Sequence, residues 1–292
     1  MTRPLWHKIT LFIFWAILLW CVLYPFINPP KASQTSIKTI EADYLNTTNA
    51  LLKVGDGANF GVVFNEHEIQ LVPSFSQGKP IPQFGQMIDV KSKKSIYFEY
   101  IGQMSERINQ IIVIQRQFLI SIRNKPSLST AEQLAFNYLS HTYRVKNAPQ
   151  PEMIERLLHR VAPIPTPLVQ VQTANESGWG TSRFARKGYN FFGLWCYQTG
   201  CGFIPKQRID GMNHEVARFD SLAKAMYRYK LNLNRNRAYR EMRDIRARQM
   251  SDDNFALSYA MIGGLKAYSE RGDAYIDELR DMLEFNREFL HE

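Results

Sequence analysis

One acidic side chain, Glu176, is followed by Ser-Gly-Trp-Gly and comes directly after an apolar segment. That segment predicts a helix, because Thr166 suits the N-cap, Pro167 suits the first helical position and Gly178 is a natural stop. Glu176 then lies in the last turn, where the exposed carbonyl groups disfavour negative charge. Aromatic neighbours would desolvate the carboxyl as well, and both effects raise its pKa. A carboxyl group that stays protonated near neutral pH is what a glycosidase uses as its general acid.

The ordinary alternative is a solvated glutamate at a helix end. Here glycines and the aromatic residues Trp179, Phe184 and Phe191 surround the position in sequence. An aromatic-lined cleft is typical of sites that grip sugar rings. The local sequence therefore favours a carbohydrate site built around Glu176.

The stretch ESGWGTSRFARKGYNFFGLW, which begins at Glu176, resembles the signature of glycoside hydrolase family 73, the peptidoglycan-cleaving glucosaminidases. The resemblance continues in ARFDS at 217–221 and in YSERGDAYIDEL from Tyr268, and it spans about residues 91–288. It implies a mainly α, α+β fold, with a lysozyme-like helical lobe and a small β-hairpin lobe around a groove. It also implies hydrolysis of the β-1,4 bond after N-acetylglucosamine in the glycan strands of peptidoglycan.

The resemblance assigns roles to individual residues. Glu176 matches the general acid, and Tyr268 matches a tyrosine that lines the site. The segment at 190–193 matches the groove floor. The predicted catalytic residues are Glu176, Tyr268 and Glu215, and the predicted substrate-binding residues are Trp179, Asn190, Phe191, Phe192, Gly193, Trp195 and Tyr275.

A second catalytic carboxylate is the least determined part of the site. Many family members carry a second Glu on the hairpin, and here the hairpin segment offers Asp210 and Glu215 alone. Asp210 precedes Gly211, a pair typical of a turn. Glu215 is either the second catalytic group or a residue on a strand facing solvent. If neither serves, the N-acetyl group of the substrate can assist.

The N-terminus predicts a membrane anchor. Residues 9–27 carry no charged side chain, and as a helix this run is about 28 Å long, close to the hydrocarbon thickness of a bilayer. Arg3 and Lys8 precede it, which places residues 1–8 in the cytoplasm. Because no Ala-x-Ala site follows, we expect a retained single-pass anchor at 9–28 in a bacterial inner membrane, with the catalytic domain in the periplasm.

The rest of the chain divides by its pattern into three parts. Residues 29–90 predict a stalk or small strands, residues 91–148 a helical extension, and residues 149–292 the catalytic domain. In the extension, apolar residues recur at spacings of three and four, and Ser129 with Glu132 forms a capping box. After residue 91, only the segment from Trp195 to Phe219 departs from the helical period, which predicts the β-lobe between two groups of helices.

Charge and cysteines limit the possible partners. The net charge of +9 favours an anionic partner, but no phosphate loop or zinc finger supports nucleic acid. The basic run at 228–249 is either a solvated helix face or a surface for an acidic polymer. Cys196 and Cys201 suit a disulfide in an oxidising compartment. No HExxH motif or metal-ligand cluster occurs, so we expect neither a metal nor a cofactor.

Two other functions fit the same residues. A peptidoglycan-binding scaffold would keep the groove without useful catalysis. A lytic transglycosylase would share the lone Glu and the fold, but its products end in anhydro sugars.

Overall fold

The computed structural model describes residues 80–205, 214–249 and 253–290, together with the backbone of four short strands before them. These strands pair antiparallel, β1 (Leu52–Lys53) with β2 (Asn59–Phe60) and β3 (Val63–Phe64) with β4 (Ile69–Gln70). The predicted cytoplasmic segment 1–8 and anchor 9–28 lie outside the described residues. Among the helices that are described, none is both long and apolar enough to cross a bilayer.

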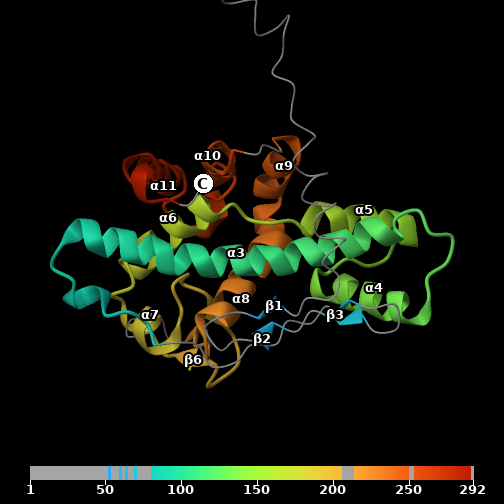
Figure 1. The fold of residues 1–292 in the computed structure, drawn as a ribbon, viewed down its shortest axis with the longest axis horizontal. Helices are drawn as coiled ribbons and strands as arrows, with labels where there is room; N and C mark the ends of the chain where they lie inside the picture. The colour runs from blue at the N-terminus through green and yellow to red at the C-terminus, as the bar shows by residue number, and fades with distance from the viewer. Residues whose placement is uncertain are drawn as a thin grey trace, which may run out of the picture. The chain divides into compact units, whose positions relative to one another are not determined.

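The longest described helix is α3 (Val90–Ile122), which runs across the centre of the domain (Figure 1). The side chain of Asp89 caps its first turn by accepting a hydrogen bond from the Ser92 backbone N–H. The apolar stripe read from the sequence is largely buried, except that Ile96 is 44% exposed near the helix start. Since α3 packs against α6 and α8, the extension predicted at 91–148 shares one core with the residues that follow it.

The other described helices come in the following order along the chain. They are α4 (Thr130–Thr142), α5 (Gln150–Arg160), α6 (Thr166–Ser177), α7 (Arg183–Gly188), α8 (Leu222–Arg235), α9 (Arg240–Arg248), α10 (Asn254–Ile262) and α11 (Asp273–Phe285). Short 3-10 turns stand at η1 (Phe84–Gln86), η2 (Arg237–Tyr239), η3 (Lys266–Tyr268) and η4 (Arg287–Phe289). The capping box of Ser129 and Glu132 is confirmed at the start of α4.

Helix α6 lies at the centre of the fold, in contact with α3, α10 and α11. Its side chains are buried on every face apart from Asn175 and Glu176 near its end. The helix begins at Thr166, so Thr166 is its first residue rather than its cap. Gly178 ends it in the left-handed conformation, with φ +56°, as predicted. Because α6 is packed on all sides, the backbone that carries Glu176 is held in one position.

The β-lobe is a three-stranded antiparallel sheet rather than a simple hairpin. Its strands are β5 (Trp195–Cys196), β6 (Gly202–Phe203) and β7 (Glu215–Ala217), in the order β5-β7-β6. Val216 on the central strand pairs with Trp195 on one side and with Phe203 on the other. The mainly α, α+β class is therefore confirmed, while the predicted turn at Asp210 lies outside the described residues.

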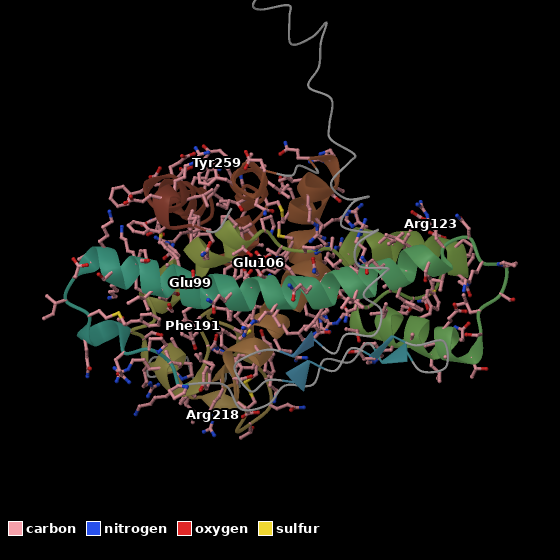
Figure 2. The ribbon with its side chains drawn as sticks, viewed as in Figure 1. Glu99, Glu106, Arg123, Phe191, Arg218 and Tyr259 are labelled. Carbon is pink, nitrogen blue, oxygen red and sulfur yellow. A yellow bond between two sulfur atoms is a disulfide. The ribbon has the colours of Figure 1, made fainter. Side chains whose placement is uncertain are left out.

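One apolar core joins the long helix, α6 and the C-terminal helices. Figure 2 shows Phe191 inside the domain near α3, whereas Arg123, Arg218 and Tyr259 lie toward its periphery. Phe191 belongs to the segment between α7 and β5, so this connection is packed into the core rather than laid over the surface.

Candidate active site

Glu176 is half-buried in the last turn of α6. Burial is the main effect on its carboxyl, and it raises the pKa. A hydrogen bond from the hydroxyl of Tyr275 to Oε1, 2.8 Å long, and the charge of Arg271 act in the opposite direction. Burial outweighs them, so the pKa of Glu176 lies above its ordinary value. The direction is the one expected from the sequence, and desolvation is its leading cause.

Buried side chains hold Tyr275 in place behind this carboxyl. The amide of Gln172 donates a 3.0 Å hydrogen bond to the Tyr275 hydroxyl, and the hydroxyl of Tyr229 donates to the amide oxygen of Gln172. All three side chains are buried, and the Tyr229 ring stacks on Phe192 with ring centres 4.4 Å apart. Hydrogen bonds thus run from α8 through α6 to α11 and end on Oε1 of Glu176.

Gly193 lies against the other carboxylate oxygen. A Cβ atom placed on Gly193 would stand 3.3 Å from Oε2 of Glu176, and the residue has φ +65°. The hydroxyl of Tyr268 donates a 2.6 Å hydrogen bond to the carbonyl of Phe192, and the rings of Tyr268 and Tyr275 are parallel. The structure therefore brings four of the predicted site residues together at the end of α6. They are Glu176, Gly193, Tyr268 and Tyr275.

The remaining residues of the predicted groove floor support the backbone at Gly193. Asn190 donates 2.8 Å hydrogen bonds to the carbonyls of Leu194 and Ala217. The rings of Phe191 and Phe192 are fully buried. Because these rings are buried, they cannot contact a sugar in a groove. They hold the backbone of this segment in place instead.

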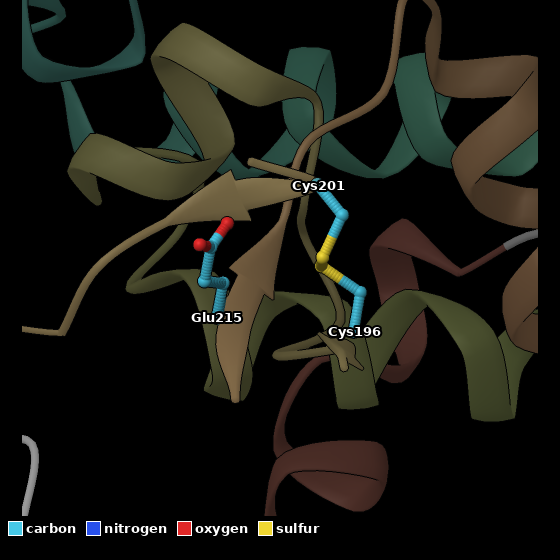
Figure 3. A group of neighbouring side chains, drawn as sticks. All are labelled: Cys196, Cys201 and Glu215. Atoms are coloured by element: carbon cyan, nitrogen blue, oxygen red, sulfur yellow. A yellow bond between two sulfur atoms is a disulfide. The ribbon is translucent and has the colours of Figure 1, made fainter. Parts of the chain in front are cut away.

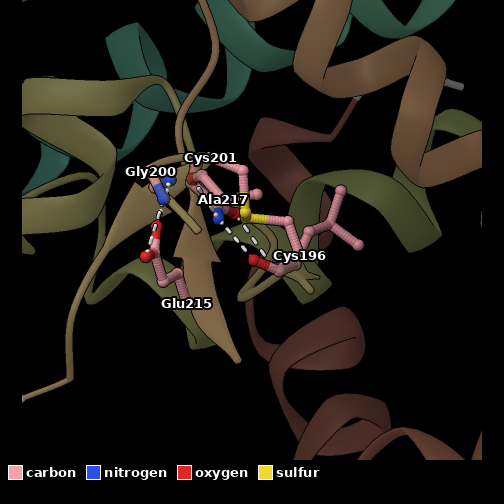
Figure 4. Close-up of a disulfide and its surroundings, with 8 residues drawn as sticks. Cys196, Gly200, Cys201, Glu215 and Ala217 are labelled. Carbon is pink, nitrogen blue, oxygen red and sulfur yellow. Dashed lines mark hydrogen bonds between the residues drawn. A yellow bond between two sulfur atoms is a disulfide. The ribbon is translucent and has the colours of Figure 1, made fainter. Parts of the chain in front are cut away.

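Cys196 and Cys201 form the disulfide suggested by their spacing, and Glu215 lies beside it (Figure 3). Glu215 is 4% exposed, which makes the solvent-facing alternative wrong. Its two carboxylate oxygens accept hydrogen bonds from the backbone N–H groups of Gly200 and Gly202, at 2.9 and 2.8 Å (Figure 4). The sulfurs and the carboxylate lie within 4.8 Å of one another, a spacing suited to a metal. The two sulfurs are bonded to each other in the disulfide and are not free thiolates for a metal. The bond closes the loop between Cys196 and Cys201.

The two predicted tryptophans lie in different surroundings. Trp195 on β5 is 54% exposed and stacks on His214, with ring centres 3.9 Å apart. An exposed ring two residues beyond Gly193 suits the apolar face of a sugar. Trp179 packs edge-on against Tyr97 and Phe98, and it lines a pocket of about 860 Å³ between α3 and α11. Trp179 therefore belongs to that pocket, whose lining does not include Glu176.

Sequence reasoning missed the residues that support the acid. Gln172 precedes Glu176 by four positions, so both side chains lie on one face of α6. A polar residue in an otherwise apolar helix segment was a signal that could have identified Gln172 as a partner of the site. Asn175 donates a 2.8 Å hydrogen bond to Glu278, which also pairs with Arg271. Tyr229 and Glu278 lie on helices far along the chain, and no local pattern pointed to either.

Comparison with known proteins identifies the family of this domain. A family model described as glucosaminidase, mannosyl-glycoprotein endo-beta-N-acetylglucosaminidase, matches residues 153–286. The chain is 34% identical over 184 residues to "Protein bax" of Escherichia coli (strain K12), an alignment that covers 62% of this chain and 65% of that relative. No solved structure gives a significant match. The matched region contains Glu176, Tyr268 and Tyr275, and the chain thus carries a domain of the glucosaminidase family, of the type found in glycoside hydrolase family 73.

Proposed function

We propose that this protein is a peptidoglycan hydrolase that cleaves the β-1,4 bond after N-acetylglucosamine, with Glu176 as its general acid. The observation that carries the proposal is the half-buried carboxyl of Glu176, whose pKa is raised by burial in a glucosaminidase-family domain. A raised pKa favours the protonated form of the carboxyl, which is the form that a general acid needs. Tyr275 and the backbone at Gly193 flank its two oxygens, which supports a fixed orientation of the carboxyl.

In the proposed reaction, Glu176 donates its proton to the glycosidic oxygen while the bond from that oxygen to the anomeric carbon breaks. Positive charge develops on the ring that is left behind. The leaving sugar takes the proton and departs as an alcohol. Glu176, now a carboxylate, can accept a proton from the water that completes hydrolysis.

The positive charge on the ring needs a nucleophile. Glu215 is held by two backbone N–H groups at the disulfide loop, and Glu278 is held by Asn175 and Arg271. Both carboxylates already have a structural use. This favours a reaction in which the N-acetyl oxygen of the bound sugar attacks the anomeric carbon, and water then opens the cyclic intermediate.

A lytic transglycosylase is the second candidate, because it too needs a single protein carboxyl. There a hydroxyl of the substrate attacks the anomeric carbon, and the product is an anhydro sugar one water lighter than the hydrolysis product. Mass spectrometry of the fragments released from purified sacculi distinguishes the two reactions. A non-catalytic scaffold would release no fragments.

Glu176→Gln tests the acid directly. Glutamine keeps the shape and the acceptor for Tyr275 but has no proton to give, so we expect release of fragments from sacculi to fall at least about a hundredfold. The variant should melt no lower than the wild type at neutral pH, because it removes a desolvated carboxyl. Glu284→Gln, on an exposed part of α11, is the matched control. Wild-type turnover by Glu176→Gln would contradict the proposal.

We further propose that residues 9–28 anchor the chain in the bacterial inner membrane, with the catalytic domain in the periplasm. The apolar N-terminal run and the disulfide, a bond typical of oxidising compartments, support this. Protease added to spheroplasts should digest the domain. Protection until the membrane is lysed would contradict the orientation.

A further inference from the structure

The pocket that contains Trp179 lies between the first turns of α3 and one face of α11. Its volume is about 860 Å³, enough for a short peptide. Val90 and Phe285 lie at its edge with 64% and 78% of their surface exposed. Large apolar side chains exposed around a pocket are typical of a surface that binds a ligand or another molecule.

The charges in the pocket have opposite signs on opposite walls. Lys93 and Lys94 stand on α3, while Asp277 and Asp281 stand one turn apart on α11. In the part of the chain that the structure describes, no ion pair involves any of these four residues. Lys94 instead lies over the rings of Phe285 and Trp179, 4.4 and 5.6 Å from their centres. Such a pocket is complementary to a ligand that carries both a carboxylate and an amine.

The pocket is connected to the acid through Glu278. Glu278 lines it and accepts the hydrogen bond of Asn175, the residue next to Glu176. Trp179 comes three residues after Glu176, beyond the turn at Gly178. A ligand held here therefore contacts Trp179 and Glu278, two residues linked to the end of α6, and its position can set where an attached sugar meets Glu176.

We propose that this pocket binds the peptide stem of peptidoglycan, a short peptide with carboxylates and a free amine. The proposal rests on the function proposed above and adds the part of the substrate that the enzyme recognises besides the glycan. Lys93 and Lys94 face the stem's carboxylates, Asp277 and Asp281 face its amine, and Trp179 and Phe285 cover its aliphatic part.

The direct test uses a synthetic stem peptide whose N-terminus is acetylated, so that the probe carries no sugar and has a single free amine on its side chain. Calorimetry with the full chain should show binding. The double variant Asp277→Asn with Asp281→Asn should weaken it about tenfold, the effect of one lost charge-assisted hydrogen bond. Acetylating the peptide's side-chain amine as well should weaken binding equally, and the double variant should then have no further effect. Glu284→Gln, on the same helix outside the pocket, should bind as the wild type does.

The side of the pocket that carries Lys93 and Lys94 is tested in the same way. Lys93→Gln should weaken binding of the stem, whereas Lys146→Gln, an equal charge change on an exposed loop, should leave it unchanged. Absence of binding by the wild type, or equal binding by pocket and control variants, would overturn the proposal. Release of fragments from sacculi is measured in parallel. Digestion without stem binding removes the pocket proposal alone, and stem binding without digestion removes the proposed hydrolysis alone.

Discussion

At the scale of single residues, the two largest effects on the acidity of Glu176 oppose each other. Burial raises the pKa of its carboxyl, while the hydroxyl of Tyr275 donates to the charged form and lowers it. Burial is the larger effect. Because the protonated form is the active one, the proposed activity should fall as pH rises through this raised pKa.

Tyr275→Phe separates these effects. Loss of the hydroxyl removes an interaction that lowers the pKa of Glu176, so the alkaline limb of the rate profile should move to higher pH. The rate at the optimum should also fall about tenfold, because the carboxyl loses the bond that orients it. The pH dependence of fragment release from sacculi measures both changes.

Tyr259→Phe is the matched control, since Tyr259 lies partly exposed on α10. It should leave the rate and the profile unchanged. An alkaline limb that stays in place or moves to lower pH in Tyr275→Phe would contradict this account of the acid.

At the scale of elements, the two parts of the site are built differently. Helix α6 is fixed by packing on α3, α10 and α11. The strands of the β-lobe are two or three residues long, so their ladder contributes few hydrogen bonds. The disulfide and the hydrogen bonds from the backbone N–H groups of Gly200 and Gly202 to Glu215 add stabilising links that the short strands do not provide.

Replacing both cysteines of this loop by serine should therefore destabilise the protein. The disulfide closes a short loop, and the chain-entropy estimate for a loop of this size is about 2 kcal/mol of unfolding free energy. Urea unfolding measures the change. A reductant should lower the stability of the wild type by a similar amount and leave the serine variant unchanged. A reductant without effect on the wild type would mean that the bond contributes nothing.

At the scale of the whole molecule, several cations of the basic run face inward. Lys230 is fully buried and donates hydrogen bonds to Ser105 and Asn109 on α3. Arg246 donates to the backbone carbonyls of His159, Arg160, Ala162 and Pro163 and to the side chain of Asn234. Neither side chain is a solvated charge or a free binding surface. They join helices that are distant in sequence.

Arg246→Met should lower the unfolding free energy by at least about 3 kcal/mol, because several buried acceptors lose their donor together. Arg240→Met is the matched control on the same helix. Its side chain is exposed and its ion pair with Asp244 lies at the surface, so the change should stay within about 0.5 kcal/mol. Equal melting of the two variants would show that the buried arginine does not join the helices.

The sequence by itself determined the features that depend on neighbours along the chain. The capping box at Ser129, the stop at Gly178 and the place of Glu176 in the last turn follow from local signals. So does the mainly α, α+β class. The spacing of Cys196 and Cys201 suggested a disulfide, and the structure shows that the bond forms. Each of these depends on backbone propensity or on residues within a few positions of one another.

Only the tertiary structure decided which distant residues meet. It placed Tyr275 and Gly193 on the two oxygens of Glu176, and Tyr229 behind Gln172. It also placed Trp179 in the pocket between α3 and α11, whose lining does not include Glu176. The contacts of Glu176 and Gln172 join α6 to later segments of the chain, and they form only when several helices bury their apolar faces together. No periodicity or spacing within one segment carries that information.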